Sequence, residues 1–130
     1  MTHSLSVRVY YEDTDLAGIV YYANYLKFIE RGRSEWVRGL GIDQARLKAG
    51  AGIVFAVRRV EADYLSPARY DDLLEIRTAP EAVTGARIVL LQEIRRGETL
   101  LFTARVVLVC LAEGGQPVRV PRPLRALLGG

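Results

Sequence analysis

The sequence predicts a single α+β domain of two layers, in which a five-stranded antiparallel sheet wraps around one long central helix. Three observations predict it. The 130 residues are enough for one hydrophobic core but too few for two domains. One segment with helical periodicity is followed by four segments that resemble strands. The turns between those strands are short, which favours antiparallel pairing because parallel neighbours need a long crossover. We therefore expect residues 1–130 to form one domain.

The first half of the chain predicts a strand and then the long helix. Apolar side chains alternate with more polar ones from Leu5 to Tyr11, the period of a half-buried strand. From about Tyr22 to Trp36 the apolar positions recur every three or four residues, which predicts a helix of about four turns with one apolar face. Gly39–Gly41 ends this helix, since glycine readily takes the left-handed conformation.

The second half predicts a short helical segment and then strands joined by turns. Proline, aspartate and glycine mark the turns at "SPARYDD" and "RRGE", and "EGGQP" ends the last strand. Two predicted segments lie close to the C-terminus of the helix: a short helix at 42–49 and a glycine loop at 50–52. The predicted strands are 53–64, 73–79, 86–94 and 99–111, and "PRPLRALLGG" closes the chain with about one helical turn.

Composition and charge exclude several classes of protein. A hydrophobic fraction of 50% with 25% charged residues is typical of a folded domain and argues against disorder. The net charge of +3 comes from arginines scattered along the chain, without the basic stripe or motif of a nucleic-acid binder. A moderately positive surface is compatible with a small phosphorylated ligand, because arginine pairs with phosphate in bidentate geometry.

The chain also predicts a cytoplasmic protein. No apolar run approaches the ~20 residues of a membrane span, and no signal peptide is visible at the N-terminus. A single cysteine, Cys110, excludes an internal disulfide and suits a reducing compartment. Cys110 lies in an apolar run, so we interpret it as a core residue rather than a nucleophile.

Residues 12–21, which connect the first strand to the long helix, carry the chemistry. Asp15 precedes the helix N-terminus, where unpaired amides and the helix dipole favour negative charge. A carboxylate there can attack an ester-like bond or activate water, while the amides stabilise the oxyanion. Gly18 would let the backbone approach a ligand or take an unusual conformation. Spacing alone favours the alternative that Asp13, Thr14 and Asp15 are only turn and cap residues.

A family resemblance favours the catalytic interpretation. The segments "VYYEDTDLAGIVYYANYLKFIERGRSEWVR" and "FAVRRVEADYLSPARYDDLLEI" resemble the hot-dog proteins of the 4-hydroxybenzoyl-CoA thioesterase-like family, and most closely their Tol-Pal-associated acyl-CoA thioesterase branch. The resemblance implies a hot-dog fold, dimers that often pair into tetramers, and hydrolysis of acyl-CoA thioesters at the subunit interface. It implies neither a metal nor a redox cofactor, and CoA is present only as part of the substrate.

The resemblance also assigns roles to single residues. Asp15 matches the catalytic carboxylate of the family, and Gly18 matches the glycine of its motif. Tyr22 matches the residue whose backbone N–H polarises the thioester carbonyl. Asn24 and Tyr25 match the pair at the start of the helix and are candidate substrate-binding residues.

One position departs from the pattern of the Tol-Pal-associated branch. Members of that branch commonly carry histidine where this chain has Tyr22, whereas the benzoyl-CoA type has tyrosine there. His3 is the only histidine and lies near the N-terminus, so a mechanism based on histidine is excluded. This departure does not decide whether the acyl group of the substrate is aromatic or aliphatic. The lack of a histidine in this segment also argues against a hot-dog dehydratase, which usually needs one in its active site.

Other residues are candidates either for binding CoA or for purely structural roles. Arg58 and Arg59 in the second strand and Arg87 near the start of a later strand are candidates for the CoA phosphates. Asp13 is expected to hydrogen-bond within its loop. Four aromatic residues are expected in the core or in an interface: Tyr10, Tyr11, Tyr21 and Trp36.

Two functions from different classes remain open. The first is an acyl-CoA thioesterase for a small or medium acyl group, with Asp15 as nucleophile or general base. The second is a non-catalytic module that binds acyl-CoA or an acyl-carrier protein, in which Asp15 only caps the helix. Unpaired strand edges predict a homo-oligomer, either dimer or tetramer, because such edges must be covered. The family analogy adds a peripheral association with cell-envelope machinery.

Overall fold

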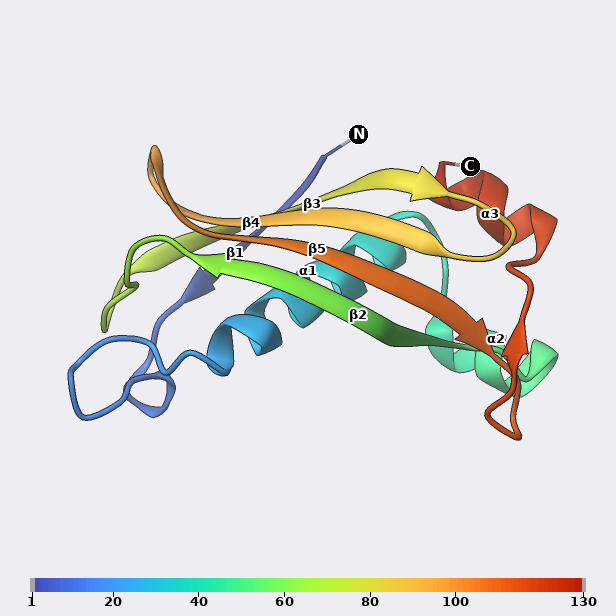
Figure 1. The fold of residues 1–130 in the computed structure, drawn as a ribbon, viewed down its shortest axis with the longest axis horizontal. Coiled ribbons are helices and arrows are strands. Elements are labelled where there is room, and N and C mark those ends of the chain that lie inside the picture. Colours follow the sequence, from blue (N-terminus) through green and yellow to red (C-terminus); the bar gives the residue numbers. More distant parts are fainter. Residues whose placement is uncertain (1, 130) are drawn as a thin grey trace.

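A computed structural model describes residues 2–129 and confirms the α+β prediction (Figure 1). One antiparallel sheet in the order β1-β3-β4-β5-β2 makes one layer, and the long helix α1 packs against β1, β3 and β4. The elements are β1 (His3–Arg8), the 3-10 helix η1 (Tyr11–Asp13), α1 (Asn24–Gly39), α2 (Gln44–Ala51), β2 (Val54–Tyr64), β3 (Leu73–Val83), β4 (Ile88–Arg96), β5 (Thr99–Leu111), β6 (Pro117–Val118) and α3 (Arg122–Leu128).

The sheet has a sixth, two-residue strand that the sequence does not predict. β4 pairs with β5 only as far as Leu108, which leaves the end of β5 without a neighbour on that side. The turn after β5 brings β6 back into this position, where Val118 pairs with Cys110 and Pro117 with Leu111. A strand of two residues shows no alternation, so no periodicity could reveal it.

The first strand ends earlier than predicted. β1 stops at Arg8 rather than Tyr11, and the chain turns through η1 instead. The Asp13 carboxylate accepts a hydrogen bond from the Tyr10 amide at 2.8 Å, which starts that turn. Tyr10 and Tyr11 are consequently exposed, as is Tyr21, so none of the three is a core residue, whereas Trp36 is buried as expected.

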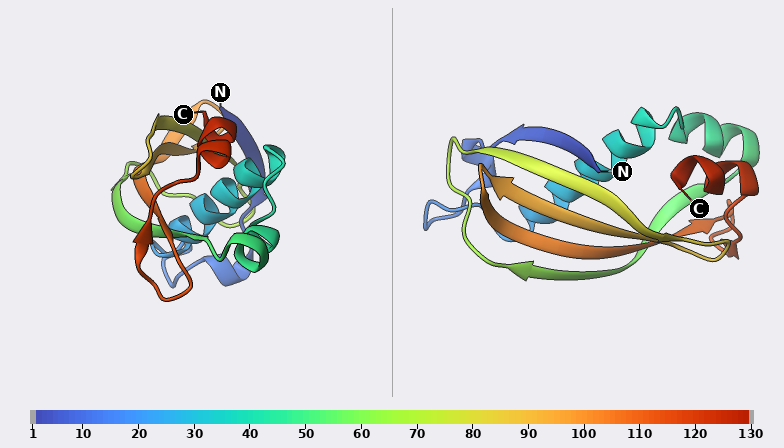
Figure 2. Two further views of the ribbon diagram at one scale, coloured as in Figure 1. Left: turned by 90° about the vertical axis from the view of Figure 1, so that its right-hand side faces the viewer. Right: turned by 90° about the horizontal axis from the view of Figure 1, so that it is seen from above.

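Helix α1 begins two residues later than predicted, at Asn24, and lies lengthwise within the curve of the sheet (Figure 2). Tyr22 is therefore outside the helix and exposed, and Leu26 is also exposed, so these two members of the predicted apolar face are wrong. The rest of that face is buried against the sheet. The buried residues of α1 are Asn24, Tyr25, Phe28, Ile29, Gly32, Trp36 and Val37.

A small polar network fixes the helix over the sheet. The side-chain amide of Gln92 on β4 donates to the Ile29 carbonyl at 2.9 Å and to the Thr78 hydroxyl at 2.8 Å. Arg33 donates to the Gln92 carbonyl oxygen at 3.1 Å, and burial lowers the pKa of Arg33 while Glu30 opposes that shift. Because buried polar groups are costly when unpaired, this network specifies one register of α1 on the sheet.

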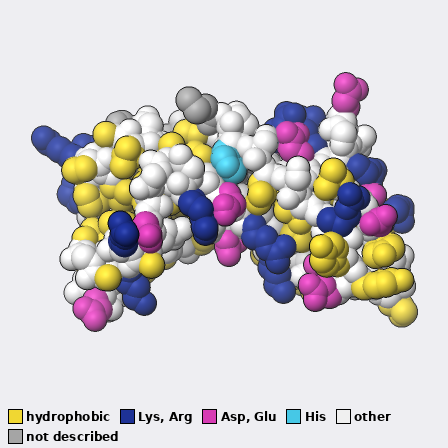
Figure 3. Space-filling view, turned by 180° about the vertical axis from the view of Figure 1, so that it is seen from behind, with side chains coloured by type: hydrophobic (Ala, Val, Ile, Leu, Met, Phe, Trp, Pro, Cys, Tyr) yellow, Lys and Arg dark blue, Asp and Glu magenta, His cyan; other side chains and the backbone are white. Residues whose placement is uncertain are grey.

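Two strands, β1 and β2, form the edges of the main sheet. Side chains in the middle of β2, among them Val57 and Val60, are exposed. Figure 3 shows the opposite side of the molecule from Figure 1, where acidic and basic side chains are mixed without a large area of one sign. Cys110 is fully buried, which confirms its prediction as a core residue. Within residues 2–129, no helix is long and apolar enough to cross a bilayer.

Candidate active site

The connection between β1 and α1 contains a small hairpin formed by residues 13–21. At its base the Tyr21 amide donates to the Asp13 carbonyl at 2.9 Å, and Thr14 pairs with Val20 in an antiparallel bridge. The Val20 amide donates to the Ala68 carbonyl at 2.8 Å, which ties this hairpin to the segment between β2 and β3. The predicted loop is therefore an ordered structure with a base and a tip.

Asp15 and Gly18 form the tip of the hairpin. The Asp15 amide donates to the Ile19 carbonyl at 2.9 Å, and the Gly18 amide donates to the Asp15 carbonyl at 3.0 Å. Gly18 has φ +79°, and a Cβ there would meet nothing within 4 Å. Glycine is thus needed for the left-handed backbone that closes the turn, which confirms one of its two predicted roles.

The Asp15 side chain is exposed and available for chemistry. One carboxylate oxygen, Oδ1, accepts a hydrogen bond from the Ala17 amide at 2.9 Å. The other oxygen has no donor among residues 2–129. Asp15 therefore presents one oxygen held by the turn and a second oxygen that is free to approach a substrate or a water.

The start of α1 presents unpaired amides beside this hairpin. Neither the Tyr22 nor the Ala23 amide has a hydrogen-bond acceptor within the described part of the chain, and the N-cap residue Ala23 makes no side-chain cap. Such orphan donors, together with the helix dipole, favour an anion or a developing oxyanion. The amide predicted to polarise the thioester carbonyl, that of Tyr22, is one of the two.

Asp15 does not lie directly against the helix start. It is two residues beyond the Asp13–Tyr21 pair along the hairpin, a span of about 7 Å for extended backbone, and α1 begins nine positions after it. The sequence places Asp15 before the helix, and the hairpin holds it at a tip two residues away from the base that precedes α1.

Asp13 has the structural role expected of it. Its carboxylate holds the Tyr10 amide, and its carbonyl oxygen accepts from both the Tyr21 amide and the Asn24 side chain. Asp13 thus joins η1, the hairpin base and the first residue of α1. Its hydrogen bonding within the loop is confirmed.

Asn24 and Tyr25 both face the interior of the chain. The Asn24 side-chain amide donates to the Asp13 carbonyl at 2.9 Å. The Tyr25 hydroxyl accepts from the Ala68 amide at 3.0 Å, and its ring stacks on Phe102 with centroids 5.3 Å apart. Both residues position the helix start and the neighbouring loop, while their contact with substrate stays a prediction.

Tyr64, at the end of β2, contacts the helix start, although no motif in the sequence marks it. Its hydroxyl donates to the Tyr22 carbonyl at 2.8 Å, and its ring packs edge-on against Tyr25 and Phe102. Desolvation raises the pKa of Tyr64, and the hydroxyls of Tyr25 and Tyr22 add to that shift. A lone tyrosine at the end of a strand carries no motif, so only the fold reveals this contact.

The structure does not bring the predicted phosphate-binding arginines to the hairpin. Arg58 lies at a bulge in β2, where the pairing with β5 shifts register, and Arg59 forms an ion pair with Glu61 at 3.2 Å. Both are exposed. Arg58 precedes Tyr64 by six positions, or about 20 Å of strand.

Arg87 lies still farther from the hairpin. It follows the turn between β3 and β4, at the opposite end of the sheet from the connection that carries Asp15 (Figure 1). The nine residues of β4 alone span about 30 Å. Any joint role of Arg87 and Asp15 from a single chain therefore requires a long ligand.

Two further arginines, which no pattern in the sequence indicates, converge near Arg87. Arg119 Cζ and Arg125 Nη1 lie 2.8 Å and 3.1 Å from the position that a Cβ on Gly85 would occupy. The two guanidinium groups are thus no farther apart than the sum of these distances. Neither forms an ion pair with a carboxylate of residues 2–129. Two like charges held together without an acid attract an anion.

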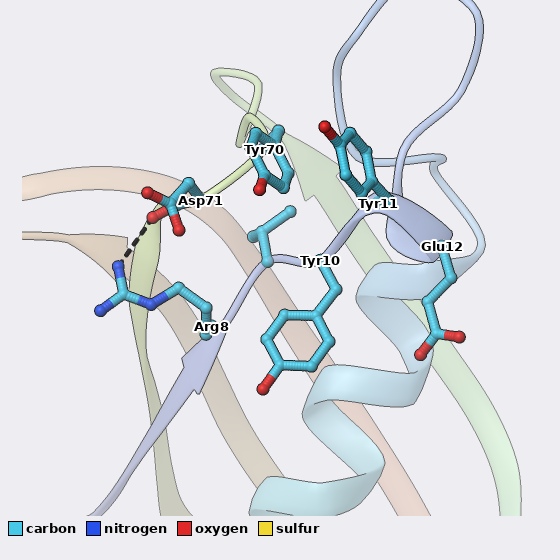
Figure 4. Close-up of a pocket in the computed structure, with 7 residues that line it drawn as sticks. Arg8, Tyr10, Tyr11, Glu12, Tyr70 and Asp71 are labelled. Atoms are coloured by element: carbon cyan, nitrogen blue, oxygen red, sulfur yellow. Dashed lines mark hydrogen bonds between the residues drawn. The ribbon is translucent and has the colours of Figure 1, made fainter.

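A surface pocket of about 420 Å³ is lined by residues 8–12 together with Tyr70 and Asp71 (Figure 4). Tyr11 and Tyr70 stack above it with ring centroids 4.5 Å apart, and Arg8 donates to the Asp71 carbonyl at 2.7 Å. Asp15 does not line this pocket. Within residues 2–129, no group of three or more potential metal-ligating side chains is gathered at one place.

Comparisons with known proteins agree with this fold. Residues 17–107 match the model of the Thioesterase superfamily. The chain is 40% identical over 124 residues to "Acyl-CoA thioesterase YbgC" of Haemophilus influenzae, which covers 95% of this chain and 91% of that protein. It is 45% identical over 106 residues to "Acyl-CoA thioester hydrolase YbgC" of Escherichia coli, covering 81% of this chain and 78% of that one.

A solved structure extends the similarity to three dimensions. The crystal structure described as "Probable Thioesterase" from Bartonella henselae superposes with a TM-score of 0.90 at 41% identity, over 93% of this chain and all of that one. The fold and the site thus define a hot-dog protein of the thioester hydrolase class. The chain belongs to the Thioesterase superfamily.

Proposed function

We propose that this protein hydrolyses acyl-CoA thioesters to the free acid and CoA, acting on a small or medium acyl group. The observation that carries the proposal is the exposed Asp15 carboxylate at a hairpin whose base presents the unpaired Tyr22 and Ala23 amides. A carboxylate in the same short segment as two free donors fits a reaction in which negative charge develops on a carbonyl oxygen. Family membership and the names of the two YbgC relatives support the same substrate class.

In this mechanism the carbonyl oxygen of the thioester accepts a hydrogen bond from the Tyr22 amide. Asp15 then acts in one of two ways. It attacks the carbonyl carbon and displaces the CoA thiolate, forming an anhydride that water hydrolyses, or it takes a proton from a water that attacks directly. Both routes consume one water and yield the acid and CoA, and in both the carboxylate must be ionised.

The CoA phosphates are proposed to bind arginine. Arg58, Arg59 and Arg87 are the candidates from the sequence. The convergence of Arg119 and Arg125 beside Gly85 supports adding these two, as residues that a neighbouring subunit supplies, since they lie at the far end of the sheet from Asp15 of the same chain. Guanidinium groups bind phosphate in bidentate geometry, and a pair without a carboxylate partner has its donors free. We propose no metal or redox cofactor, since the only CoA required belongs to the substrate.

We propose that the active unit is a homo-oligomer, either a dimer or a tetramer, with the site at a subunit interface. Two features support this. The edge strand β2 is long and carries the exposed side chains Val57 and Val60, as expected of an edge that a second chain covers. Asp15 is exposed at the tip of its hairpin, so a neighbouring subunit would supply the missing wall of the site.

The proposed cellular setting rests on the amino-acid sequence. We propose that the protein acts in the cytoplasm on a small-molecule substrate and does not bind nucleic acid. The Tol-Pal-associated branch that the sequence resembles extends this to a peripheral association with cell-envelope machinery. That extension rests on family analogy.

A panel of acyl-CoA substrates tests the activity directly. The protein is incubated with short, medium and aromatic acyl-CoA, and the released thiol is titrated with a chromogenic disulfide. We expect turnover of at least one class. Binding of acyl-CoA by calorimetry without thiol release from any member would contradict the proposal and would favour a binding module. The rate of thiol release at several substrate concentrations also gives kcat and KM.

A further inference from the structure

The Tyr64 hydroxyl contacts the candidate site through one backbone atom. Tyr64 is the last residue of β2, and it donates to the carbonyl oxygen of Tyr22, 42 positions earlier in the chain, at 2.8 Å. Its ring is held on two sides, with centroid distances of 5.1 Å to Tyr25 and 5.0 Å to Phe102. Packing of the ring against these two core residues therefore holds the Tyr64 hydroxyl in place.

This contact fixes the direction of an unpaired amide. In a trans peptide the C=O and the following N–H point in opposite directions, and the Tyr22–Ala23 peptide is trans. Holding the Tyr22 carbonyl on one side therefore directs the Ala23 N–H to the other. The adjacent peptide is fixed in the same way, because the Tyr21 carbonyl accepts from the Asn24 amide at 2.8 Å and the Tyr22 N–H points away from it.

We propose that Tyr64 is a positioning residue: its hydroxyl holds the Tyr22–Ala23 peptide so that the amides of Tyr22 and Ala23 are directed at the thioester oxygen. This inference rests on the proposed function and deepens it. It adds Ala23 as a second oxyanion donor and makes a residue on β2 part of the support for α1. Preorganised donors stabilise the transition state because they need no reorganisation as charge develops.

The chemistry of the Tyr64 hydroxyl is suited to this role. A hydroxyl that donates must remain protonated, and burial together with the neighbouring tyrosines raises the pKa of Tyr64. At neutral pH it is therefore a donor. Phenylalanine at this position would keep the ring packing on Tyr25 and Phe102 and remove only the hydrogen bond.

Steady-state kinetics of Tyr64→Phe tests the inference. Removing an oxyanion donor costs about 100- to 1,000-fold in kcat; because this variant keeps both donors and loses only their alignment, we expect kcat to fall about tenfold. The KM should stay within about twofold, because the ground-state thioester oxygen gains little from aligned donors. Asp43→Ala is the control for stability. The Asp43 carboxylate caps α2 through the Arg46 amide at 3.1 Å, on an element outside the candidate site.

The outcomes separate this inference from the proposed function. Asp43→Ala should lower Tm about as much as Tyr64→Phe while keeping the wild-type kcat. If the wild-type protein hydrolyses acyl-CoA and Tyr64→Phe keeps more than half of its kcat, the positioning role is wrong and the proposed function stands. The same holds if Asp43→Ala loses as much kcat as Tyr64→Phe, because the loss would then follow stability. If the wild-type protein releases no thiol from any acyl-CoA, both are wrong.

Discussion

Gly32 of α1 lies so close to Ile76 of β3 that a Cβ on the glycine would come within 2.7 Å of Ile76 Cγ2. The same Cβ would meet the Thr78 hydroxyl at 3.1 Å and the Gln92 amide at 3.3 Å. Helix α1 therefore approaches the sheet through the missing side chain of one residue. This close approach sets the height of the helix over the sheet, and with it the position of the helix start where the candidate site lies.

Gly32→Ala should destabilise the protein. Overpacking typically costs about 1–3 kcal/mol, which outweighs the gain of about 1 kcal/mol from a better helix former. We expect a lower midpoint in urea unfolding. Gly50→Ala is the matched control, since Gly50 lies in α2 and a Cβ there meets nothing within 4 Å. It should raise the midpoint, and a rise for both variants would show that Gly32 is not needed for close packing.

The KM for acyl-CoA should rise with ionic strength. The proposal assigns the CoA phosphates to exposed arginines, and salt screens such contacts. A thioester of the same acyl group on pantetheine lacks the nucleotide and should respond little. Initial rates at low and high sodium chloride with both substrates give the comparison. An equal response of the two would argue against phosphate binding.

Arg119→Gln should weaken binding of the nucleotide end of the substrate. A hydrogen bond to a charged group contributes about 1.5–3 kcal/mol, so the KM for acyl-CoA should rise at least about tenfold with little change in kcat. The pantetheine thioester should keep its KM. Arg46→Gln is the control, because Arg46 is an exposed arginine of α2 that pairs with Asp43 at 3.7 Å. An equal rise in the KM for acyl-CoA in both variants would show that the effect comes from net charge and not from a contact with Arg119.

The Cys110 thiol should react slowly in the folded protein. Burial raises its pKa, and the side chain is inaccessible in the core. Because the thiolate is the reactive form, labelling needs both exposure and ionisation. We expect one slow equivalent of a thiol reagent in native buffer and fast reaction in denaturing urea. Fast labelling of the native protein would show that β5 opens near its end.

Much of the fold could be predicted from residue patterns, and the exceptions have physical reasons. The period of α1 identifies the helix because it buries one face, and the turn signals between β2, β3, β4 and β5 separate these strands. β3 runs on to Val83 through Pro80, which a predicted end at Ala79 misses. Register shifts beside Pro80 let the strand accommodate a residue that cannot donate to the ladder.

The candidate site could be predicted only in part. Asp15, Gly18 and Tyr22 lie in one local segment, so a motif can reveal them together. Tyr64 and the pair Arg119 and Arg125 reach their places through tertiary pairing, and no spacing in the sequence indicates it. The hairpin itself is set by backbone bonds from Asp13 to Tyr21, which no side-chain pattern indicates.

The turnover of Asp15→Asn tests the central claim most directly. The amide keeps the shape of the side chain and its bond from the Ala17 amide while removing the charge and the basicity. A positioned base contributes about 100- to 10,000-fold, so kcat should fall at least 100-fold, while binding of acyl-CoA persists. Asp13→Asn is the control, since the Asp13 carboxylate holds the Tyr10 amide at 2.8 Å and should affect stability more than turnover. If Asp15→Asn kept more than half of the wild-type kcat while Asp13→Asn lost it, the roles of the two aspartates would be the reverse of those proposed here.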